Sequence, residues 1–292
     1  SRIAMEYSPD GTLPRVSRVD AGTIERIRNL GMEIVSSADL IQDTTQRWTA
    51  SQLEGHKSAA VKLSQIVQEA FTYVGLNLLG EITEGDVAKF IHHRFRDLRL
   101  MAEDGPVVAV NAHSGDPHYD PNAGNSILRR GDWLLIDLWA KEQESDAVYA
   151  DITWVGYIGE VVPERYLRIF ELVSGARDAA LDFMVRSHQR GRVLQGWEVD
   201  RVARNFITRR GYGRYFTHRL GHSLGREVHG NAVNLDSWET HDTRRISEGF
   251  AVTIEPGVYL PEFGVRSEID VYLSANGPVV TTSVQRGIFL IN

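Results

Sequence analysis

The stretch that most constrains the fold covers residues 250–273 and carries two acidic residues in strand-like sequence. Glu255 ends a β-branched run, and Glu268 follows thirteen residues later in a second such run. Pro256 and Gly257 interrupt the first strand, because proline has no N–H to donate to a neighbour. A carboxylate inside a buried strand is costly unless a cation pairs with it. Two of them on neighbouring strands indicate that the cation is a metal.

Composition narrows the class of protein. The chain has 292 residues, 42% of them hydrophobic, which suits one large domain or two smaller ones with a filled core. A formal net charge of −7 gives no basic surface for nucleic acid or an anionic membrane, and no apolar run reaches the ~18 residues of a membrane span. The absence of cysteine excludes disulfides, thiolate metal sites and cysteine nucleophiles. We expect a cytoplasmic globular protein that binds neither nucleic acid nor membrane.

Residues 1–47 contain a short strand, a turn at residues 9–11, a helix near residues 23–30, and then a second strand and the start of a helix. A segment of this size is too small to bury a core of its own. We interpret it as the C-terminal remnant of a smaller N-terminal α/β domain with its linker. Residues 48–292 then form the main domain.

The main domain repeats one plan, at about residues 49–158 and 163–292. Each half has a long amphipathic helix, a second helix, and a pair of strands that carry acidic residues. In the first half, Ser51 and Glu54 fit a capping box, and Thr83 precedes the second helix. In the second half, Pro163 opens the long helix. This order predicts an α+β fold with an internal pseudo-twofold repeat, antiparallel sheets and helices packed on the outside.

The first half carries its own acidic pair. Asp137 lies in a strand between Ile136 and Leu138, which must point to the opposite face, and Asp151 follows fourteen residues later. Any one of these acids alone is more often a salt-bridged or edge-strand carboxylate. Four that converge from two halves would repel each other strongly at low dielectric. A pair of divalent cations removes that repulsion, because bridging carboxylates suit two metals.

Three histidines, His218, His222 and His229, fall within twelve residues. The spacing of the first two is that of a zinc-binding helix, but that motif needs glutamate directly after the first histidine, and Arg219 stands there. Neighbouring glycines disfavour a regular helix and suit a strand or bulge where backbone approaches a ligand closely. The segment therefore favours one metal ligand and two groups that contact substrate.

These motifs, IDLWA with ADITW, HRLGHSLGREVHG, TIEPGVY and GVRSEID, resemble the pita-bread metallopeptidases. That family includes methionine aminopeptidase, aminopeptidase P, prolidase and the metal-free creatinase. The resemblance covers residues 48–292 and is greatest to the aminopeptidase P and prolidase branch. It implies a pita-bread catalytic domain, hydrolysis of Xaa-Pro bonds in a dipeptide or short peptide by a metal-bridging hydroxide, and a homodimer.

The resemblance also assigns roles to residues. Asp137 would hold one metal, Asp151 and Glu268 would bridge both, and His222 with Glu255 would complete the other. The oxygen-rich set favours two Mn²⁺ ions, with Co²⁺, Fe²⁺ or Zn²⁺ as alternatives. The residues that would act on substrate or support the site are Glu255 as proton shuttle, His229 as the group that stabilises the tetrahedral intermediate, His118 as a substrate-side histidine, and His218 and Arg266.

Three features depart from the family pattern. The connection from Asp137 to Asp151 is longer, Ile269 follows the last glutamate, and Trp154 stands where arginine is common. Two other functions compete with the peptidase. A creatinase-like C–N hydrolase would lack the metal ligands that this chain keeps, and a non-catalytic pita-bread scaffold would usually have lost them.

Overall fold

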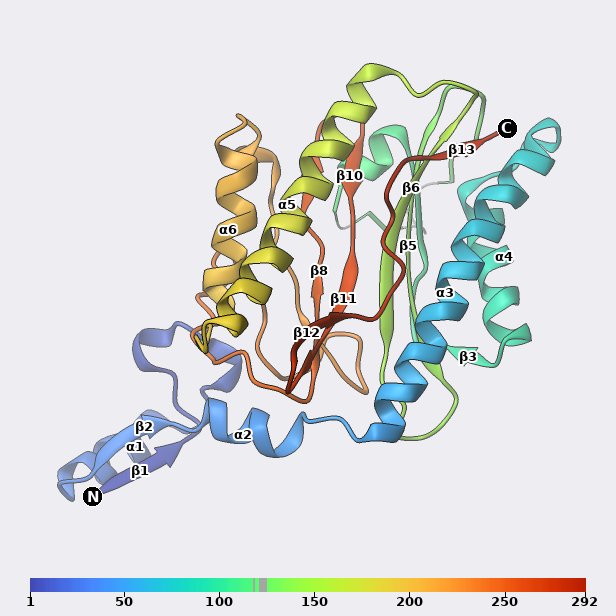
Figure 1. Cartoon of the computed structure of the whole chain (residues 1–292). Coiled ribbons are helices and arrows are strands. Elements are labelled where there is room, and N and C mark those ends of the chain that lie inside the picture. The colour runs from blue at the N-terminus through green and yellow to red at the C-terminus, as the bar shows by residue number, and fades with distance from the viewer. Residues whose placement is uncertain (118, 121–124) are drawn as a thin grey trace.

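The computed structural model describes residues 1–117, 119–120 and 125–292. Two pairs of helices lie on the outside of the molecule with most of the strands between them (Figure 1). One pair is α3 (Ala50–Asn77) with α4 (Glu84–Asp97), and the other is α5 (Glu164–Gln189) with α6 (Gly196–Thr208). The predicted α+β fold with outer helices is confirmed.

The helix starts follow from local capping. Thr49, not Ser51, caps α3, and its hydroxyl accepts a hydrogen bond from the backbone N–H of Gln52, whose side chain accepts from Thr49 N in return. The predicted capping box at Ser51 is therefore wrong by two residues, because Gln52 closes the box as well as a glutamate would. Thr83 caps α4 and Pro163 precedes α5, as predicted.

The first sheet is built on β5 and β6, which pair antiparallel along most of their length. Strands β3 and β4 pair antiparallel with β5, and β13 joins β6 in parallel. The strands are β3 (Leu100–Met101), β4 (Val107–Val110), β5 (Trp133–Glu142), β6 (Ala150–Ile158) and β13 (Phe289–Ile291).

The second half has a four-stranded antiparallel sheet in the order β12-β11-β8-β7 and a two-stranded pair, β9 with β10. The bounds are β7 (Ser223–Leu224), β8 (Ala251–Ile254), β9 (Gly257–Tyr259), β10 (Gly264–Arg266), β11 (Ile269–Ser274) and β12 (Gly277–Val280).

The acids Glu255 and Glu268 were expected inside strands, and the structure corrects this. Glu255 lies in the break between β8 and β9, and Glu268 lies in the break between β10 and β11. The pairing of β8 with β11 ends at Ile254 opposite Ile269, and that of β9 with β10 ends at Gly257 opposite Arg266. Both residues therefore lie in the same break between the two strand pairs, and their carboxylates can face one site.

Each half buries its own hydrophobic core. In β5, Leu134, Ile136 and Leu138 pack with the buried faces of α3 and α4. Trp133 and Leu135 belong instead to the core that α5 and α6 cover. Because side chains alternate along a strand, Asp137 lies on the same side as Leu135 and faces the second half. The predicted orientation of Asp137 away from its apolar neighbours is confirmed.

The N-terminal elements extend away from the two halves (Figure 1). The strands β1 and β2 form a parallel pair, and α2 runs back toward the main body. Gln42 Nε2 donates to the carbonyl of Arg245 at 2.7 Å, and His241 N–H donates to the carbonyl of Thr12. The division at residue 47 stays a prediction. The elements are β1 (Arg2–Met5), α1 (Ala21–Asn29), β2 (Glu33–Ser36) and α2 (Ala38–Thr45).

Five short 3₁₀ turns complete the described chain. They are η1 (Pro9–Gly11), η2 (Pro14–Val16), η3 (Leu78–Gly80), η4 (Asn111–Gly115) and η5 (Gly213–Tyr215). None of the helices in the described ranges combines the length and the apolar composition that crossing a bilayer requires.

Candidate active site

Both halves of the main domain line a cavity of about 400 Å³. Eight of the nine predicted site residues line it: Asp137, Asp151, His218, His222, His229, Glu255, Arg266 and Glu268. The ninth, His118, lies outside the described residues, although its neighbours Pro117 and Tyr119 line the cavity. Residues more than a hundred positions apart thus meet in one place, as predicted.

Pairing of β5 with β6 places the two aspartates. Asp137 lies opposite Thr153, and Asp151 lies opposite Trp139, so both aspartates and Thr153 face the same side. The Thr153 hydroxyl donates to Glu268 Oε2 at 2.7 Å, which joins the first half to the second. Thr153 therefore belongs to the acidic face.

Arg266 is the cation at the centre of the acids. Its Nη2 contacts Asp137 Oδ2, its Nε donates to Thr153 Oγ1 at 2.9 Å, and its Nη1 donates to the Tyr259 hydroxyl at 2.9 Å. Glu255 Oε2 lies 4.0 Å from Arg266 Nε. One buried guanidinium cannot neutralise four carboxylates.

The backbone around His222 fits tightly against β8. His222 N–H donates to Thr253 Oγ1 at 2.9 Å, and Thr253 N–H donates to His222 O at 2.8 Å. A Cβ on Gly221 would lie 2.0 Å from the Thr253 carbonyl oxygen, so only glycine fits there. As predicted, the segment is not helical, but its backbone lies close to Thr253 of β8 and not to a ligand.

The His222 ring has a defined tautomer. Nδ1 lies 3.2 Å from the carbonyl oxygen of Ser223, which can only accept, so Nδ1 carries the hydrogen. The lone pair of Nε2 then points toward Glu255 Oε1 at 3.4 Å and Asp151 Oδ2 at 3.7 Å. Burial lowers the pKa of His222 well below its ordinary value, which keeps the ring neutral. A lone pair that faces two carboxylates is unfavourable unless a cation or a proton lies between them.

The four acids of the site are also disfavoured in their charged forms. Burial and neighbouring carboxylates raise the pKa of Asp151 and of Glu268 well above their ordinary values. Burial raises the pKa of Asp137, although Arg266 opposes it, and burial raises the pKa of Glu255 to about 7. Without a further cation, the charged forms of these four acids are disfavoured.

The donors fit a divalent cation. Asp151, His222 and Glu268 each offer one ligand atom, and these atoms lie within 4.8 Å of one another. Asp151 Oδ1 and Glu268 Oε1 are buried and have no hydrogen-bond partner in the described part of the chain. Buried oxygens without a donor, beside an unprotonated imidazole nitrogen, are what a metal requires. Asp137 and Glu255 flank this group.

The other two histidines differ in their surroundings. His218 is buried, with Nδ1 2.6 Å from the Arg219 carbonyl oxygen and Nε2 2.8 Å from the Tyr259 hydroxyl. His229 is exposed at the cavity, and its ring packs edge-on against that of His222 with centroids 4.4 Å apart. His218 therefore supports the site, and His229 is accessible to a substrate.

Sequence reasoning gave no role to two supporting residues. Asp270 is fully buried, and its Oδ2 accepts a hydrogen bond from the backbone N–H of Asp151 at 2.9 Å. Tyr259 links His218 to Arg266. The signal was available for Asp270, because a polar residue two positions after Glu268 faces the same side of a strand. No sequence signal singles out Tyr259.

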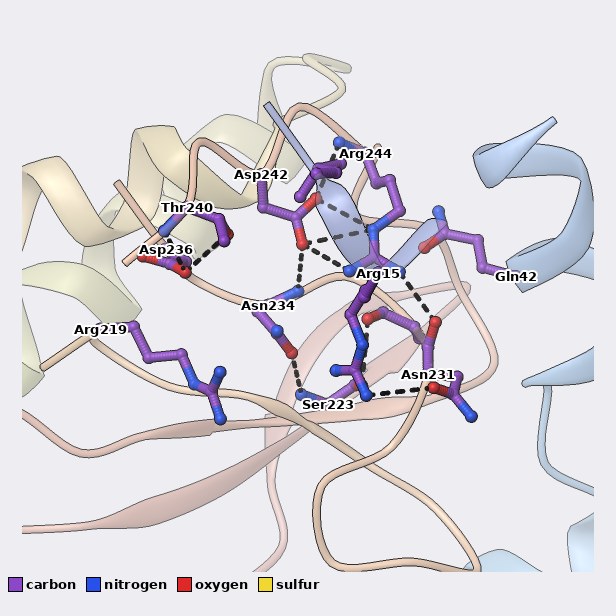
Figure 2. A network of polar contacts seen from close by, with 12 residues as sticks. Arg15, Gln42, Arg219, Ser223, Asn231, Asn234, Asp236, Thr240, Asp242 and Arg244 are labelled. Carbon is purple, nitrogen blue, oxygen red and sulfur yellow. Dashed lines mark hydrogen bonds and ion pairs between the residues drawn. The ribbon is translucent and has the colours of Figure 1, made fainter. Parts of the chain in front are cut away.

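A polar network holds Ser223, the residue after His222, through Asn234 and Asp242 (Figure 2). Asn234 Oδ1 accepts from Ser223 N–H at 3.2 Å, and Asn234 N–H donates to Asp242 Oδ2 at 2.8 Å. Asp242 also binds the buried guanidinium of Arg244. The network fixes the loop that carries His229 without entering the cavity.

Known proteins resemble this chain in sequence and in structure. The Xaa-Pro dipeptidase of Pyrococcus horikoshii is 34% identical over 215 residues, which is 70% of this chain and 56% of the relative. The crystal structure of an X-Pro aminopeptidase from Thermotoga maritima superposes with a TM-score of 0.72 at 28% identity, over 94% of this chain and 73% of the other. A prolidase structure from Pyrococcus horikoshii gives a TM-score of 0.70 at 27% identity, over 94% and 74% of the two chains.

This chain therefore spans a little over half the length of the curated relatives that it matches. The structural neighbours have the pita-bread fold, which confirms the predicted architecture. The sequence model of metallopeptidase family M24 matches residues 58–275, which include every described residue of the predicted site. On this match, the chain belongs to metallopeptidase family M24.

Proposed function

We propose that the chain is a metal-dependent peptidase that hydrolyses the bond before proline in a dipeptide or short peptide. The observation that supports it is the meeting of the His222 lone pair with two unpartnered carboxylate oxygens, of Asp151 and Glu268, in an accessible cavity. Relatives of similar sequence are named Xaa-Pro dipeptidase, which supports the choice of substrate.

Five residues would hold two divalent cations: Asp137, Asp151, His222, Glu255 and Glu268. Four carboxylates and one imidazole favour Mn²⁺, with Co²⁺, Fe²⁺ and Zn²⁺ as alternatives. When bound, the cations would neutralise the buried acids, polarise the scissile carbonyl and acidify a water.

The chain's own residues would then position the substrate and move protons. Glu255 Oε1 accepts a hydrogen bond from Thr253 at 3.0 Å, which holds the carboxylate so that it could take a proton and deliver it to the leaving nitrogen. The ring of His229 has no hydrogen-bond partner in the described ranges, so it is available to donate to the carbonyl oxygen as negative charge develops there. A role for His118 on the substrate side stays a prediction.

Proline at the leaving side fits the cavity walls. An Xaa-Pro amide is tertiary and offers no N–H, so the site needs apolar ring contacts there and no acceptor. Val107, Pro117, Tyr119, Trp139 and Val228 supply apolar surface around the acids. A secondary amide would lose the ring contact and leave its N–H unpaired, at a cost of about 1–3 kcal/mol. A homodimer and a cytoplasmic location stay predictions.

Substrate preference tests the proposal. With Mn²⁺ added, Ala-Pro or Ala-Pro-Ala should be hydrolysed roughly ten- to a hundredfold faster than Ala-Ala and Met-Ala-Ser, measured as kcat/KM. Equal or faster turnover of Met-Ala-Ser would contradict specificity for proline. Hydrolysis of creatine instead of peptides would favour the creatinase-like alternative, and metal binding without turnover of any peptide would favour the scaffold.

A further inference from the structure

The connection between β5 and β6, whose greater length departs from the family pattern, is a packed part of the molecule. Ala147, Val148 and Tyr149 are buried, and the last two belong to the core that α5 and α6 cover. Lys141, near the end of β5, is also buried, with 8% of its surface exposed. A buried ammonium is costly unless polar groups compensate it. The contacts of Lys141 therefore bear on what the connection does.

Lys141 contacts the loop that carries His229. Its Nζ donates to the carbonyl oxygen of Arg226 at 2.5 Å and lies 4.7 Å from the centre of the Tyr149 ring. In the described part of the chain, the ammonium forms no ion pair with a carboxylate. The backbone N–H of Tyr149 donates to the carbonyl oxygen of Gly225 at 2.9 Å. The connection therefore binds two consecutive carbonyl oxygens of the loop.

This loop, residues 225–231, lies between two cavities. Val228 and His229 line the catalytic cavity, and the other five residues line a second cavity of about 470 Å³. Val228 is the only residue of the loop with an apolar side chain, and it packs against the hydrophobic core. Because cavities lie on both sides and a single side chain packs, the position of the loop depends mainly on hydrogen bonds.

The two arms of the loop are held by different parts of the chain. On the far arm, Arg244 Nη1 donates to the carbonyl oxygen of Asn231 at 2.8 Å (Figure 2). The N–H of Gly230 donates to the carbonyl oxygen of Ser223 at 2.7 Å. The near arm is bound by the connection between β5 and β6. His229 lies between these two attachments, so its position depends on both.

We propose that Lys141 is a positioning residue, which holds Arg226 so that His229, three residues later, faces the catalytic cavity. This inference rests on the proposed function, in which His229 donates to the substrate carbonyl, and it gives the longer connection a role. Lys141 is not among the described residues that line the cavity. Its loss should nevertheless slow turnover, because a misplacement of about 1 Å can cost about a hundredfold in rate.

Turnover of Ala-Pro by the Mn²⁺-loaded protein measures this effect. Lys141→Met removes the ammonium and keeps the length of the side chain. It should lower kcat by roughly ten- to a hundredfold and leave KM nearly unchanged, because His229 would act mainly in the transition state. Lys141→Arg can still donate to a carbonyl oxygen and should keep most of the rate. Lys62→Met is the matched control, because Lys62 Nζ binds Glu142 at 2.7 Å, on the opposite face of β5.

A double-mutant cycle assigns the loss to His229. His229→Ala combined with Lys141→Met should be no slower than His229→Ala alone, because the lysine then has no histidine to position. If the two losses multiply, Lys141 affects the rate by another route and the proposal is overturned. Wild-type kcat in Lys141→Met overturns it as well.

An NMR signal separates this inference from the proposed function. In the full chain loaded with diamagnetic Zn²⁺ and labelled at histidine Cε1, the His229 signal is the one that His229→Ala lacks. Because the His229 ring packs edge-on against His222, its signal should move in Lys141→Met and stay in place in Lys141→Arg. A moved signal without turnover by the wild-type protein would support the positioning role and refute the peptidase. Turnover by the wild-type protein with an unmoved signal in Lys141→Met would refute the positioning role alone.

Discussion

Buried polar residues behind the cavity join the two halves of the molecule. His56, on α3, is fully buried, with Nδ1 2.8 Å from the carbonyl oxygen of Tyr149 and Nε2 2.6 Å from Thr281 Oγ1. Because a carbonyl can only accept, Nδ1 carries the hydrogen and Nε2 accepts from Thr281. Tyr149 lies two residues before Asp151, so this histidine helps to hold the strand that carries a proposed ligand.

His56 should make the protein sensitive to acid. Burial lowers the pKa of His56 to about 4, against an ordinary value of 6.5. Between pH 6.5 and pH 4, this histidine is protonated in the unfolded chain but not in the folded protein. The free energy of unfolding therefore falls as pH decreases from 6.5 toward 4. The contribution of this one group should be on the order of 3 kcal/mol.

Chemical denaturation of the wild-type protein and of His56→Gln, at pH 7 and at pH 4.5, measures this effect. Glutamine cannot take up the proton, so the stability advantage of the wild-type protein should shrink or reverse at pH 4.5. An advantage of equal size at both values would show that His56 is not the group responsible.

The position of a single residue was predictable where it interrupts the alternation of apolar and polar residues along a strand. Asp137 between Ile136 and Leu138 is identifiable because its neighbours need a core on the other side. The contact between Gln42 and Arg245 could not be found in the same way. The two residues lie more than two hundred positions apart, and no periodic pattern links a helix side chain to a distant loop.

At the scale of an element, the position of His222 depends on a glycine. Gly221 lies where a Cβ would be 2.0 Å from the Thr253 carbonyl oxygen, and the obstacle is backbone that cannot rotate away. Gly221→Ala should therefore separate the His222 segment from β8 and destabilise the protein by about 1–3 kcal/mol or more. Thermal unfolding should show a melting temperature several degrees lower.

Gly225→Ala is the control in the same segment. The nearest atoms to a Cβ there lie 3.8 Å away, which is ordinary contact distance. Its melting temperature should stay close to that of the wild-type protein. Equal melting temperatures for both variants would mean that the contact between Gly221 and Thr253 does not hold the segment.

Elements were predictable in kind and order, and less so in their limits. The helices α3 to α6 follow from apolar spacing, whereas the start of α3 was misplaced because two adjacent capping boxes compete within a few residues. Glu255 and Glu268 fall in strand breaks where strand was predicted, and the break at Glu255 is set by Pro256, which cannot donate to the ladder. The parallel strand β13 was not predicted, since its partner β6 lies over a hundred residues earlier.

At the scale of the whole molecule, the two halves meet at their acids. The first half supplies Asp137 and Asp151, and the second half supplies Glu255 and Glu268 with His222. Cations held there would join the halves and stabilise the folded state alone, because the unfolded chain cannot assemble the five ligands. Metal binding, stability and activity should therefore rise and fall together.

The rate of Ala-Pro hydrolysis, before and after removal of metal, tests the central claim most directly. One preparation is treated with chelator, dialysed, and assayed without metal and after Mn²⁺ is restored, beside Glu268→Gln treated in the same way. We predict that chelation abolishes turnover and that Mn²⁺ restores it. Glu268→Gln should stay at least about a hundredfold slower, because loss of a residue that only supports a metal ligand already costs up to that factor in activity. Full turnover by the chelated wild-type protein, or by Glu268→Gln, would contradict a metal-dependent active site in this cavity.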